Sequence, residues 1–301
     1  MKKYSVLMSV YKNEKPGILR QSMQSIYDQT VPTDDFVLIC DGPLTKRLDE
    51  TIAEMQEQFG KRLRVIRHEE NHGLGYCLRT GLPECKNDYV ARMDSDDISR
   101  KDRCEKQLEI FEKNPDISTV GCIVGEFKVT TDDIKTMRKV PETNEQIIKF
   151  AKWRSPMNHP SVMLKKSDIL AVGNYPDVRN CQDWYLWINL LTNGYKCYNI
   201  QEILVFMRED YTTFKRRAGM RYFKIQKHLY DIMRERKFIS LPMYMAAVSV
   251  RFCSAMAPNG LRKKMFEKFM REKAVDKDKC QVCSTRPIPT ASKEDIGKET
   301  N

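Results

Sequence analysis

The chain has no apolar run long enough to cross a lipid bilayer. Its longest apolar stretch covers 13 residues, from Phe238 to Val250. This stretch contains Pro242 and is followed by Arg251. A membrane-spanning helix needs roughly 20 consecutive apolar residues. With 31% charged residues and a mean hydropathy of -0.58, the sequence predicts a globular, water-soluble protein without a transmembrane helix.

The sequence also lacks the features of a secreted, disulfide-bonded protein. It opens with MKKYSVLMSVYKNE, in which Tyr11 and Lys12 interrupt a short apolar stretch, so no secretory leader is expected. The 10 cysteines are scattered through apolar runs such as VLIC and VGC, where a free thiol packs as a small hydrophobe. Cys280 and Cys283 form one C-x-x-C pair, whereas a structural zinc site needs four ligands. We therefore expect a cytoplasmic protein with reduced cysteines.

Positive charge is concentrated near the C-terminus. The formal net charge is +11, and between Phe214 and Lys273 there are 16 lysine and arginine residues against 4 acidic ones. These basic residues alternate with Phe, Tyr, Met and Leu, a pattern that suits the surface of an anionic membrane. A helical pair that packs on the rest of the protein with a solvated basic face is an equal alternative. No nucleic-acid partner is expected, because no recognisable nucleic-acid-binding module accompanies the charge.

Short apolar segments alternate with helical patterns along the first hundred residues. Strands are predicted over residues 4–10, 35–42, 63–69 and 88–94, and helices over 15–30, 47–60 and 73–85. This alternation predicts an α/β fold with a mostly parallel central sheet flanked by helices. Further on the pattern is mixed: a helix over 103–115, a strand over 117–129, a loop, strand and short helix within 153–173, and a helix and strand within 183–200.

Three aspartates, Asp94, Asp96 and Asp97, lie where the strand predicted over residues 88–94 ends. In parallel α/β sheets ligands bind at the carboxyl ends of the strands, and Asp41 follows another such end. Like charges at close range repel each other unless a cation lies among them. Mg²⁺ and Mn²⁺ prefer carboxylate oxygens, and one or two protein carboxylates suffice when a diphosphate supplies further ligands. The cluster therefore predicts a divalent cation that holds a nucleotide diphosphate.

Two further residues are candidates for an active site. Asp183 precedes Trp184 at the start of a predicted helix, where partial desolvation would make its carboxylate a stronger base. The competing interpretation is a carboxylate that caps the helix N-terminus and has no catalytic role. His159, in NHPSV, is either packed locally in a loop or a polar contact in an acceptor cleft.

Taken together, these features resemble the family 2 glycosyltransferases, which have the A-type nucleotide-diphospho-sugar transferase fold. The matches run in order over roughly residues 4–210. SVLMSVYKNE resembles the first strand with its Tyr-x-x-Glu edge, VLICDGP the strand with the base-recognising aspartate, and NHGLGYCLRTGL the Asn-x-Gly element. MDSDD resembles the metal-binding Asp-x-Asp, and NHPSVMLKK followed by QDWYLW resembles the acceptor half. Bacterial enzymes of capsule and exopolysaccharide assembly are the most similar subset.

The resemblance implies roles for individual residues. Asp183 would be the general base, Asp96 would bind Mn²⁺ or Mg²⁺ between the two phosphates, and Asp94 would approach the metal or the ribose. The nucleotide-sugar site would comprise Ser9, Val10, Tyr11, Glu14, Asp41, Gly73, Arg79, Asp94 and Ser95, with Asp41 on the base, usually uracil. Trp153, His159 and Trp184 would line the acceptor site. The basic group of the Ala-Arg-Asn tripeptide that many members have after Asn-x-Gly is displaced by one position here, to Arg79.

The implied reaction is an inverting transfer of one sugar from a nucleotide-diphosphate donor, such as a UDP-sugar, to a saccharide or lipid-linked saccharide. No Gln-x-x-Arg-Trp element is present, which favours a non-processive enzyme. Two alternatives remain: a catalytically inactive, membrane-docked assembly subunit, and a sugar-phosphate nucleotidyltransferase, although the Gly-rich phosphate loop of the latter is missing after the first strand.

The expected organisation has three parts. Residues 1–213 form a catalytic domain, with a nucleotide-binding half over about 1–100 and an acceptor half over 101–213. Residues 214–275 form a basic, amphipathic helical extension, and the polar residues 276–301 are expected to be disordered. The protein is expected in the cytoplasm, at the inner face of the cell membrane.

Overall fold

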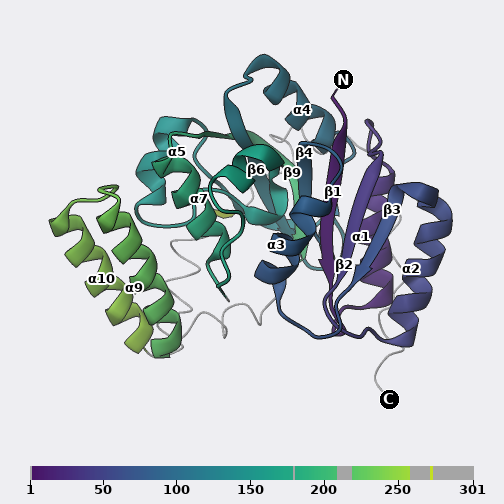
Figure 1. Cartoon of the computed structure of the whole chain (residues 1–301), viewed down its shortest axis with the longest axis horizontal. Coiled ribbons are helices and arrows are strands. Elements are labelled where there is room, and N and C mark those ends of the chain that lie inside the picture. Colours follow the sequence, from purple (N-terminus) through teal and green to yellow (C-terminus); the bar gives the residue numbers. More distant parts are fainter. Residues whose placement is uncertain (1, 179, 209–218, 258–271, 274–301) are drawn as a thin grey trace.

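The computed structural model of the chain describes residues 2–178, 180–208, 219–257 and 272–273 (Figure 1). The first half comprises β1 (Tyr4–Val10), α1 (Pro16–Tyr27), β2 (Asp35–Cys40), α2 (Lys46–Phe59), β3 (Leu63–Arg67), α3 (Leu74–Glu84) and β4 (Tyr89–Asp94). The second half comprises β5 (Ile98–Ser99), α4 (Arg103–Lys113), β6 (Ile117–Phe127), β7 (Ile134–Arg138), α5 (Asn144–Ala151), β8 (Met163–Lys165), α6 (Lys166–Ala171), α7 (Gln182–Thr192) and β9 (Lys196–Arg208). Two helices, α9 (Gly219–Glu235) and α10 (Leu241–Met256), and the short strand β10 (Glu272–Lys273) follow.

One central sheet runs through the molecule in the order β10-β7-β6-β8-β4-β1-β2-β3, with β9 beside β6 and β5. The strands β4, β1, β2 and β3 are parallel to one another, whereas β8 joins β4 to β6 in antiparallel orientation. Ser9 pairs with both Ile39 and Asp94, and Val10 pairs with Cys40. The carboxyl ends of β1, β2 and β4 therefore meet at one edge of the sheet, where Ser9, Asp41 and Asp94 lie.

Both faces of the sheet are covered by helices, as expected for strands as apolar as β2, whose six residues are all buried. On one face the core includes Met23 of α1, Ile52 of α2 and Leu108 of α4. On the other face the core is built by α3, α5, α6 and α7, with Trp187 of α7 among the largest fully buried side chains. Two helix starts carry the expected signals: Pro16 opens α1, and the Thr45 side chain caps α2.

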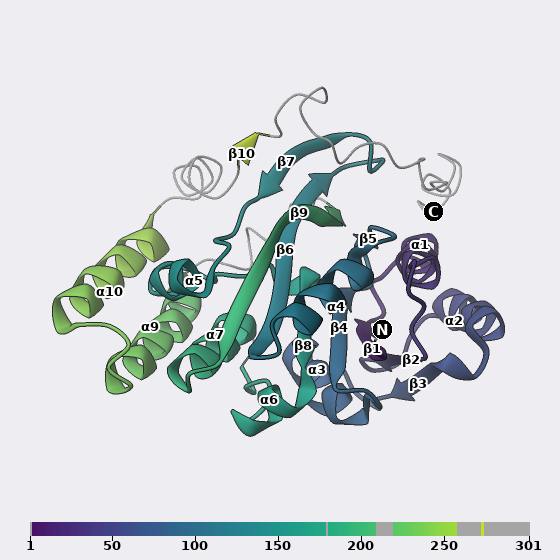
Figure 2. The same ribbon diagram turned by 90° about the horizontal axis from the view of Figure 1, so that it is seen from above.

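The helices α9 and α10 form an antiparallel pair at one end of the molecule, with α9 between α10 and the body (Figure 2). Tyr185 of α7 donates a hydrogen bond to the Ile225 carbonyl of α9, at 2.8 Å, and Arg236 donates to Asn189. The pair thus packs on the rest of the protein, as one of the two interpretations of the basic segment predicted. Among the helices that the structure describes, none is both long and apolar enough to span a bilayer.

The elements predicted for the first hundred residues are confirmed, with bounds that shift by a few residues. The strand predicted over 35–42 ends at Cys40, because the chain turns at Gly42, whose φ is 84°. The strand β7 and the helix α5 were not predicted, since neither has a long apolar pattern. The expected tail, residues 276–301, lies outside the described residues.

Gly81 allows α3 to approach the sheet closely, and it offers a test of this packing. A Cβ atom at Gly81 would lie 2.7 Å from Leu7 Cδ1 and 2.9 Å from Ile39 Cγ1, both in the buried sheet. We expect Gly81→Ala to lower the free energy of unfolding by about 1–3 kcal/mol through overpacking. Gly17→Ala in α1 is the matched control, because nothing lies within 4 Å of its Cβ position. Urea denaturation of both variants measures the difference, and equal stabilities would contradict the tight contact.

Candidate active site

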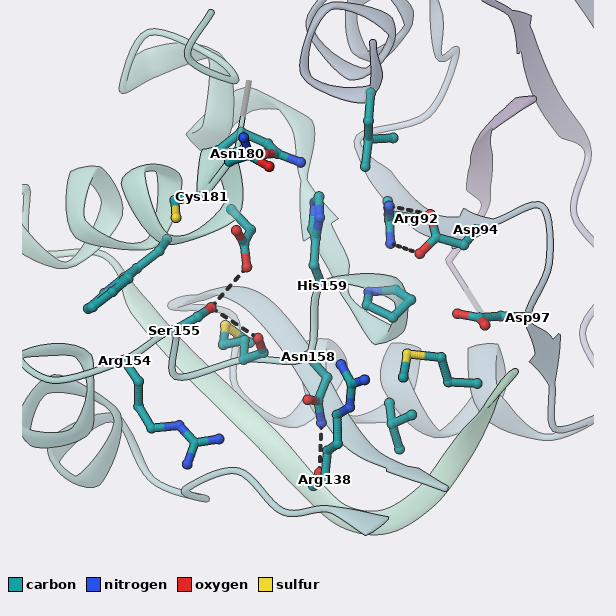
Figure 3. A pocket seen from close by; sticks show the side chains of 18 of the residues that line it. Arg92, Asp94, Asp97, Arg138, Arg154, Ser155, Asn158, His159, Asn180 and Cys181 are labelled. Atoms are coloured by element: carbon teal, nitrogen blue, oxygen red, sulfur yellow. Dashed lines mark hydrogen bonds and ion pairs between the residues drawn. The ribbon is translucent and has the colours of Figure 1, made fainter. Parts of the chain in front are cut away.

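A buried arginine anchors the acidic cluster at the end of β4. Arg92 and Asp94 form a forked ion pair, with Nη1 2.9 Å from Oδ2 and Nη2 2.5 Å from Oδ1 (Figure 3). Arg92 is 1% exposed, so its charge is poorly screened and holds the Asp94 carboxylate firmly. The sequence predicted Asp94 as a site residue but gave no role to Arg92, which reads as an ordinary polar position in an apolar strand.

The carboxylates of Asp94, Asp96 and Asp97 converge so that one oxygen of each lies within 4.8 Å of the others. Burial, followed by the charges of Asp94 and Glu14, raises the pKa of Asp96 to about 7. Burial and the charges of Asp96 and Asp94 raise the pKa of Asp97 well above its usual range. Asp97 Oδ2 is buried and has no hydrogen-bond partner. These three side chains fit a hard divalent cation, which would relieve the repulsion and satisfy that oxygen.

The strand β9 ends beside this cluster. The backbone N–H of Arg208 donates to Asp97 Oδ1 at 3.2 Å, and the Arg208 side chain reaches Gln21 Oε1 at 3.0 Å. Burial lowers the pKa of Arg208, while the charges of Asp96, Asp97 and Glu14 oppose that shift. Sequence reasoning missed Arg208, because its proximity to the aspartates depends on the pairing of β9 with β5 and β6.

The residues predicted for the nucleoside gather at the same edge of the sheet. Asp41 follows β2, and its carboxylate accepts hydrogen bonds from the backbone of His72 and Gly73 and from the Asn71 side chain, at 2.8–2.9 Å. Asp41 therefore fixes the Asn-x-Gly loop at the start of α3. It also lies close to His68 and Cys77, but the bonds from the loop already occupy its carboxylate, so nothing there calls for a second ion.

The first loop joins the acidic cluster through Glu14. Ser95 donates a hydrogen bond to Glu14 Oε2 at 2.7 Å, and Tyr11 is 42% exposed at the end of β1. Ser9 and Val10 are the last residues of β1 and lie in register with Asp94 and Cys40. The structure thus brings these predicted residues to one place around the strand ends.

Arg79 does not join them, and the structure does not support its assignment to the diphosphate. Its Nη1 donates to the Tyr175 carbonyl at 2.8 Å, which ties α3 to the loop after α6. The displacement by one position along the helix turns this side chain by about 100°. The Arg79 guanidinium therefore links two elements. Among the described residues, Arg92 and Arg208 are cations that lie near the acidic cluster.

Asp183 lies in the first turn of α7, and its side chain does not cap the helix. Cys181 is the N-cap residue, with φ 58°, and its side chain makes no cap hydrogen bond. The Asp183 carboxylate instead accepts a hydrogen bond at 3.0 Å from the hydroxyl of Ser155, which belongs to the loop after α5 (Figure 3). The bond fixes the orientation of the carboxylate, which lies in the first turn of α7 although Asp183 is not the N-cap residue.

The predicted acceptor residues differ in exposure. Trp153 is 46% exposed, whereas Trp184 is buried and donates from Nε1 to the Ala151 carbonyl. His159 is buried, and its Nε2 lies 3.1 Å from the Tyr175 hydroxyl. Burial, followed by the charge of Arg92, lowers the pKa of His159 well below its usual range, so the imidazole is neutral. His159 is therefore both packed locally and, as described next, part of the wall of a cavity.

One cavity of about 600 Å³ connects the acidic cluster to Asp183. Its walls include Asp94, Asp96 and Asp97 at one end, and Ser155, Asp183 and Trp153 at the other. His159 lies between these ends, next to Arg92 (Figure 3). The cavity is also lined by Tyr222, Gln226 and Arg251 of α9 and α10. Sequence reasoning did not place any residue of that pair in the site, since the local pattern only indicated basic amphipathic helices.

Comparison with known proteins identifies the class. The family model for glycosyl transferase family 2 matches residues 5–170, more than half of the chain. The protein is a family 2 glycosyltransferase. This membership covers β1 to α6 and includes the strand ends and the acidic cluster described above.

Curated relatives cover nearly the whole length of this glycosyltransferase. It is 36% identical over 273 residues to the UDP-Gal:alpha-D-GlcNAc-diphosphoundecaprenol beta-1,3-galactosyltransferase of Escherichia coli, covering 89% of this chain and 97% of the relative. It is 30% identical over 268 residues to the amylovoran biosynthesis glycosyltransferase AmsE of Erwinia amylovora, covering 88% and 98%.

A solved structure confirms the A-type fold of this glycosyltransferase. The mannosyltransferase PcManGT of Pyrobaculum calidifontis, in complex with GDP-Man and Mn²⁺, superimposes with a TM-score of 0.58. The match covers 88% of this chain and 79% of the mannosyltransferase, at 15% identity.

The acidic cluster predicts a pH-dependent response to metal. Because the pKa of Asp96 is about 7 in the folded state against 3.8 ordinarily, the folded protein binds more protons than the unfolded chain between these values. Without metal, the contribution of Asp96 to stability is present below pH ~4 and is lost as pH rises to ~7. Mn²⁺ binds the ionised form, so it should raise the Tm more at pH 8 than at pH 6.

Thermal denaturation with EDTA or with Mn²⁺ at both pH values tests this expectation. Asp96→Asn is the control, since it keeps the shape of the side chain and removes its charge. The gain from Mn²⁺ should shrink in this variant. An equal gain at both pH values would contradict the raised pKa, and an unchanged gain in Asp96→Asn would exclude Asp96 as a ligand.

Proposed function

We propose that this glycosyltransferase moves one sugar from a nucleotide-diphosphate donor, a UDP-sugar, to a hydroxyl of a lipid-linked saccharide, with inversion at the anomeric carbon. The observation that carries the proposal is the single cavity that joins the three aspartates to Asp183. One end of this cavity suits a metal-bound diphosphate, and the other end offers an oriented carboxylate. A sugar held between the two ends would present its anomeric carbon to the acceptor.

The donor end would hold the nucleotide at the carboxyl ends of β1, β2 and β4. Tyr11, Glu14 and Asp41 would line the nucleoside pocket, together with Ser9, Val10, Gly73 and Ser95, which lie around the same strand ends. Asp94, Asp96 and Asp97 would hold Mn²⁺ or Mg²⁺, which supplies a positive charge to the departing diphosphate. Arg92 would keep Asp94 in place through its forked ion pair.

At the acceptor end, Asp183 would act as the general base. Its carboxylate takes the proton from the acceptor hydroxyl as that oxygen attacks the anomeric carbon and the bond to the diphosphate oxygen breaks. Ser155 would be a positioning residue, because its hydroxyl donates the hydrogen bond that orients the Asp183 carboxylate. Trp153 and the neutral His159 would contact the acceptor, and the buried Trp184 would form part of the same cavity wall. The single displacement inverts the anomeric configuration.

The setting of the reaction is inferred from relatives and sequence. The Escherichia coli relative is named for a UDP-Gal donor and a lipid-linked GlcNAc acceptor, and the Erwinia amylovora relative for amylovoran biosynthesis. These names support a role in cell-surface polysaccharide assembly on a lipid-linked acceptor, and the proposal places this role at the inner face of the cell membrane. The missing Gln-x-x-Arg-Trp element supports transfer of one sugar per binding event.

The two alternative functions, a sugar-phosphate nucleotidyltransferase and an inactive membrane-docked subunit, agree less well with the observations. Family membership argues against a sugar-phosphate nucleotidyltransferase, since the chain matches the glycosyl transferase model through the strand ends where such an enzyme would need its phosphate loop. An inactive, membrane-docked subunit would keep the fold but would tolerate the loss of Asp183. The oriented carboxylate in the cavity favours an active enzyme.

Replacing the proposed base separates these two possibilities. We expect Asp183→Asn to lower kcat by about 10²–10⁴-fold, because the amide cannot accept the proton, while the Kd for UDP stays unchanged. Asp168→Asn is the matched control, since Asp168 also lies in the first turn of a helix. Sugar transfer to a lipid-linked acceptor and calorimetric binding of UDP measure the two effects. Full activity of Asp183→Asn would exclude the base role.

Donor binding is tested separately by calorimetry with UDP and GDP, with and without Mn²⁺. We expect Mn²⁺-dependent binding of UDP, weakened at least about tenfold in Asp96→Ala by loss of a metal ligand. If the protein instead binds GDP and not UDP, and Asp96→Ala weakens that binding, the proposed metal site would stand and the nucleobase of the donor would be guanine. Absence of binding to both nucleotides under every metal condition would contradict the proposed donor site.

A further inference from the structure

The outward side of α10 is an apolar surface that no described residue covers. Nine residues of this helix are exposed: Leu241, Pro242, Met245, Ala246, Ser249, Val250, Phe252, Cys253 and Met256. We call these nine residues the outer face of α10. Its large side chains are well exposed, including Met245 at 58%, Val250 at 57% and Met256 at 62%.

The outer face of α10 is continuous and carries no charge. At 3.6 residues per turn, the nine positions lie within one half of the helix circumference. The opposite half packs inward: Ala247 is buried, and the Tyr244 hydroxyl donates a hydrogen bond to Asp231 of α9. Exposed apolar residues are ordinary one at a time, but a contiguous apolar stripe on a helix marks an interaction surface.

Positive charge predominates on the helix pair that carries this stripe. Between Gly219 and Met256 the chain has 7 lysine and arginine residues against 2 acidic residues. Arg221 and Lys224 of α9 are exposed, as are Arg234 and Lys237 near the turn between the helices. Residues 258–271, which lie outside the described part of the chain, interleave more basic and apolar residues in the sequence LRKKMFEKFMR.

The outer face of α10 is apolar and the helix pair carries an excess of basic residues, and together these features indicate which partner binds there. A second copy of this chain would bring two positively charged surfaces together, which is unfavourable. The polar residues 274–301 have few large apolar side chains with which to cover the stripe. An anionic lipid surface accepts both features, since its acyl boundary takes the apolar side chains and its headgroups attract the lysines and arginines.

We propose that the outer face of α10 lies in the interface of an anionic lipid bilayer and docks the enzyme on it. The helix has 16 residues, too short for a span, so it would lie along the membrane plane.

Docking through α10 would also place the acceptor end of the cavity relative to the bilayer, an inference that rests on the proposed function. Arg251 lies on the inward side of α10, opposite the outer face: it donates a hydrogen bond to the Trp153 carbonyl, and its guanidinium stacks 5.6 Å from the centroid of the Trp184 ring. It also lines the cavity next to Tyr222 and Gln226. The same helix therefore forms part of the acceptor end of the cavity and presents the proposed membrane surface. Docking through α10 would therefore hold the acceptor end of the cavity close to the bilayer that carries a lipid-linked acceptor.

A fluorescent label on Cys253 tests the docking directly. Cys253 belongs to the outer face, and the other cysteines of the described residues are buried or half-buried. After Cys280→Ser and Cys283→Ser, an environment-sensitive dye is attached to the full chain, with Cys253→Ser checking that no other thiol reacts. Vesicles of phosphatidylglycerol and phosphatidylcholine are then added. We expect a blue shift of emission with these vesicles, and a much weaker one with pure phosphatidylcholine or at high salt.

Charged substitutions on the stripe supply the matched comparison. The pair Met245→Glu and Met256→Glu should weaken flotation with the anionic vesicles at least about tenfold. The control pair Val129→Glu and Leu170→Glu makes the same charge change at exposed apolar residues away from α10 and should have little effect. The Asp183→Asn variant should bind vesicles like the wild type, so a failure of the catalytic proposal would be distinguishable.

The outcomes decide between the occupants. The docking surface is supported if Met245→Glu with Met256→Glu (the stripe pair) loses vesicle binding, the control pair does not, and the stripe pair still transfers sugar to a water-soluble acceptor. No vesicle binding by the wild type, or equal loss in both pairs, overturns it. A dimer in light scattering that the stripe pair converts to a monomer would assign the face to a second copy and would also overturn the proposal.

Discussion

The Arg92–Asp94 ion pair is the interaction on which the site depends. Three carboxylates at one strand end would repel each other, and a buried guanidinium two residues earlier compensates one of them. Arg92 is itself held by the fold, since its backbone N–H bonds to Val162 and Arg103 bonds to its carbonyl. Arg92 does not compensate the whole cluster, because burial and the neighbouring acidic charges still raise the pKa values of Asp96 and Asp97. The end of β4 therefore carries negative charge that Arg92 does not fully compensate, and a metal ion can neutralise it.

The antiparallel strand β8 brings the two halves of the site together. It pairs with β4 on one side and β6 on the other, so the turn at His159 lies next to Arg92. The loop that carries Ser155 comes just before that turn, and its hydroxyl orients Asp183 from α7. The proposed catalytic arrangement is therefore built from segments that meet only because the sheet continues past β4. The helix pair α9 and α10 adds Tyr222, Gln226 and Arg251 to the wall of the same cavity.

Local patterns were sufficient for most elements of the first hundred residues and for the acidic cluster. The apolar segments of β1, β2 and β4 and the helices between them follow from periodicity, and the three aspartates stand out because they follow a strand. Asp183 was found through its position before a helix, although its partner Ser155 was not. Arg79 shows the limit: its charge suggested a phosphate contact, yet its side chain bonds to the Tyr175 carbonyl. The direction of a helical side chain depends on what packs beside the helix, which a single segment does not contain.

By itself the sequence determined the α/β class, the strand-end aspartates, the lack of a membrane-spanning run and the basic C-terminal segment. These properties reside in neighbouring residues, whose periodicity and charge can be read in short windows. Only the tertiary structure decided that Arg92 neutralises Asp94, that Arg208 lies against Asp97, and that α10 turns one side to the cavity and an uncharged side outwards. Each of these depends on strand register or helix packing between residues far apart in the chain, and such contacts are fixed by the whole core.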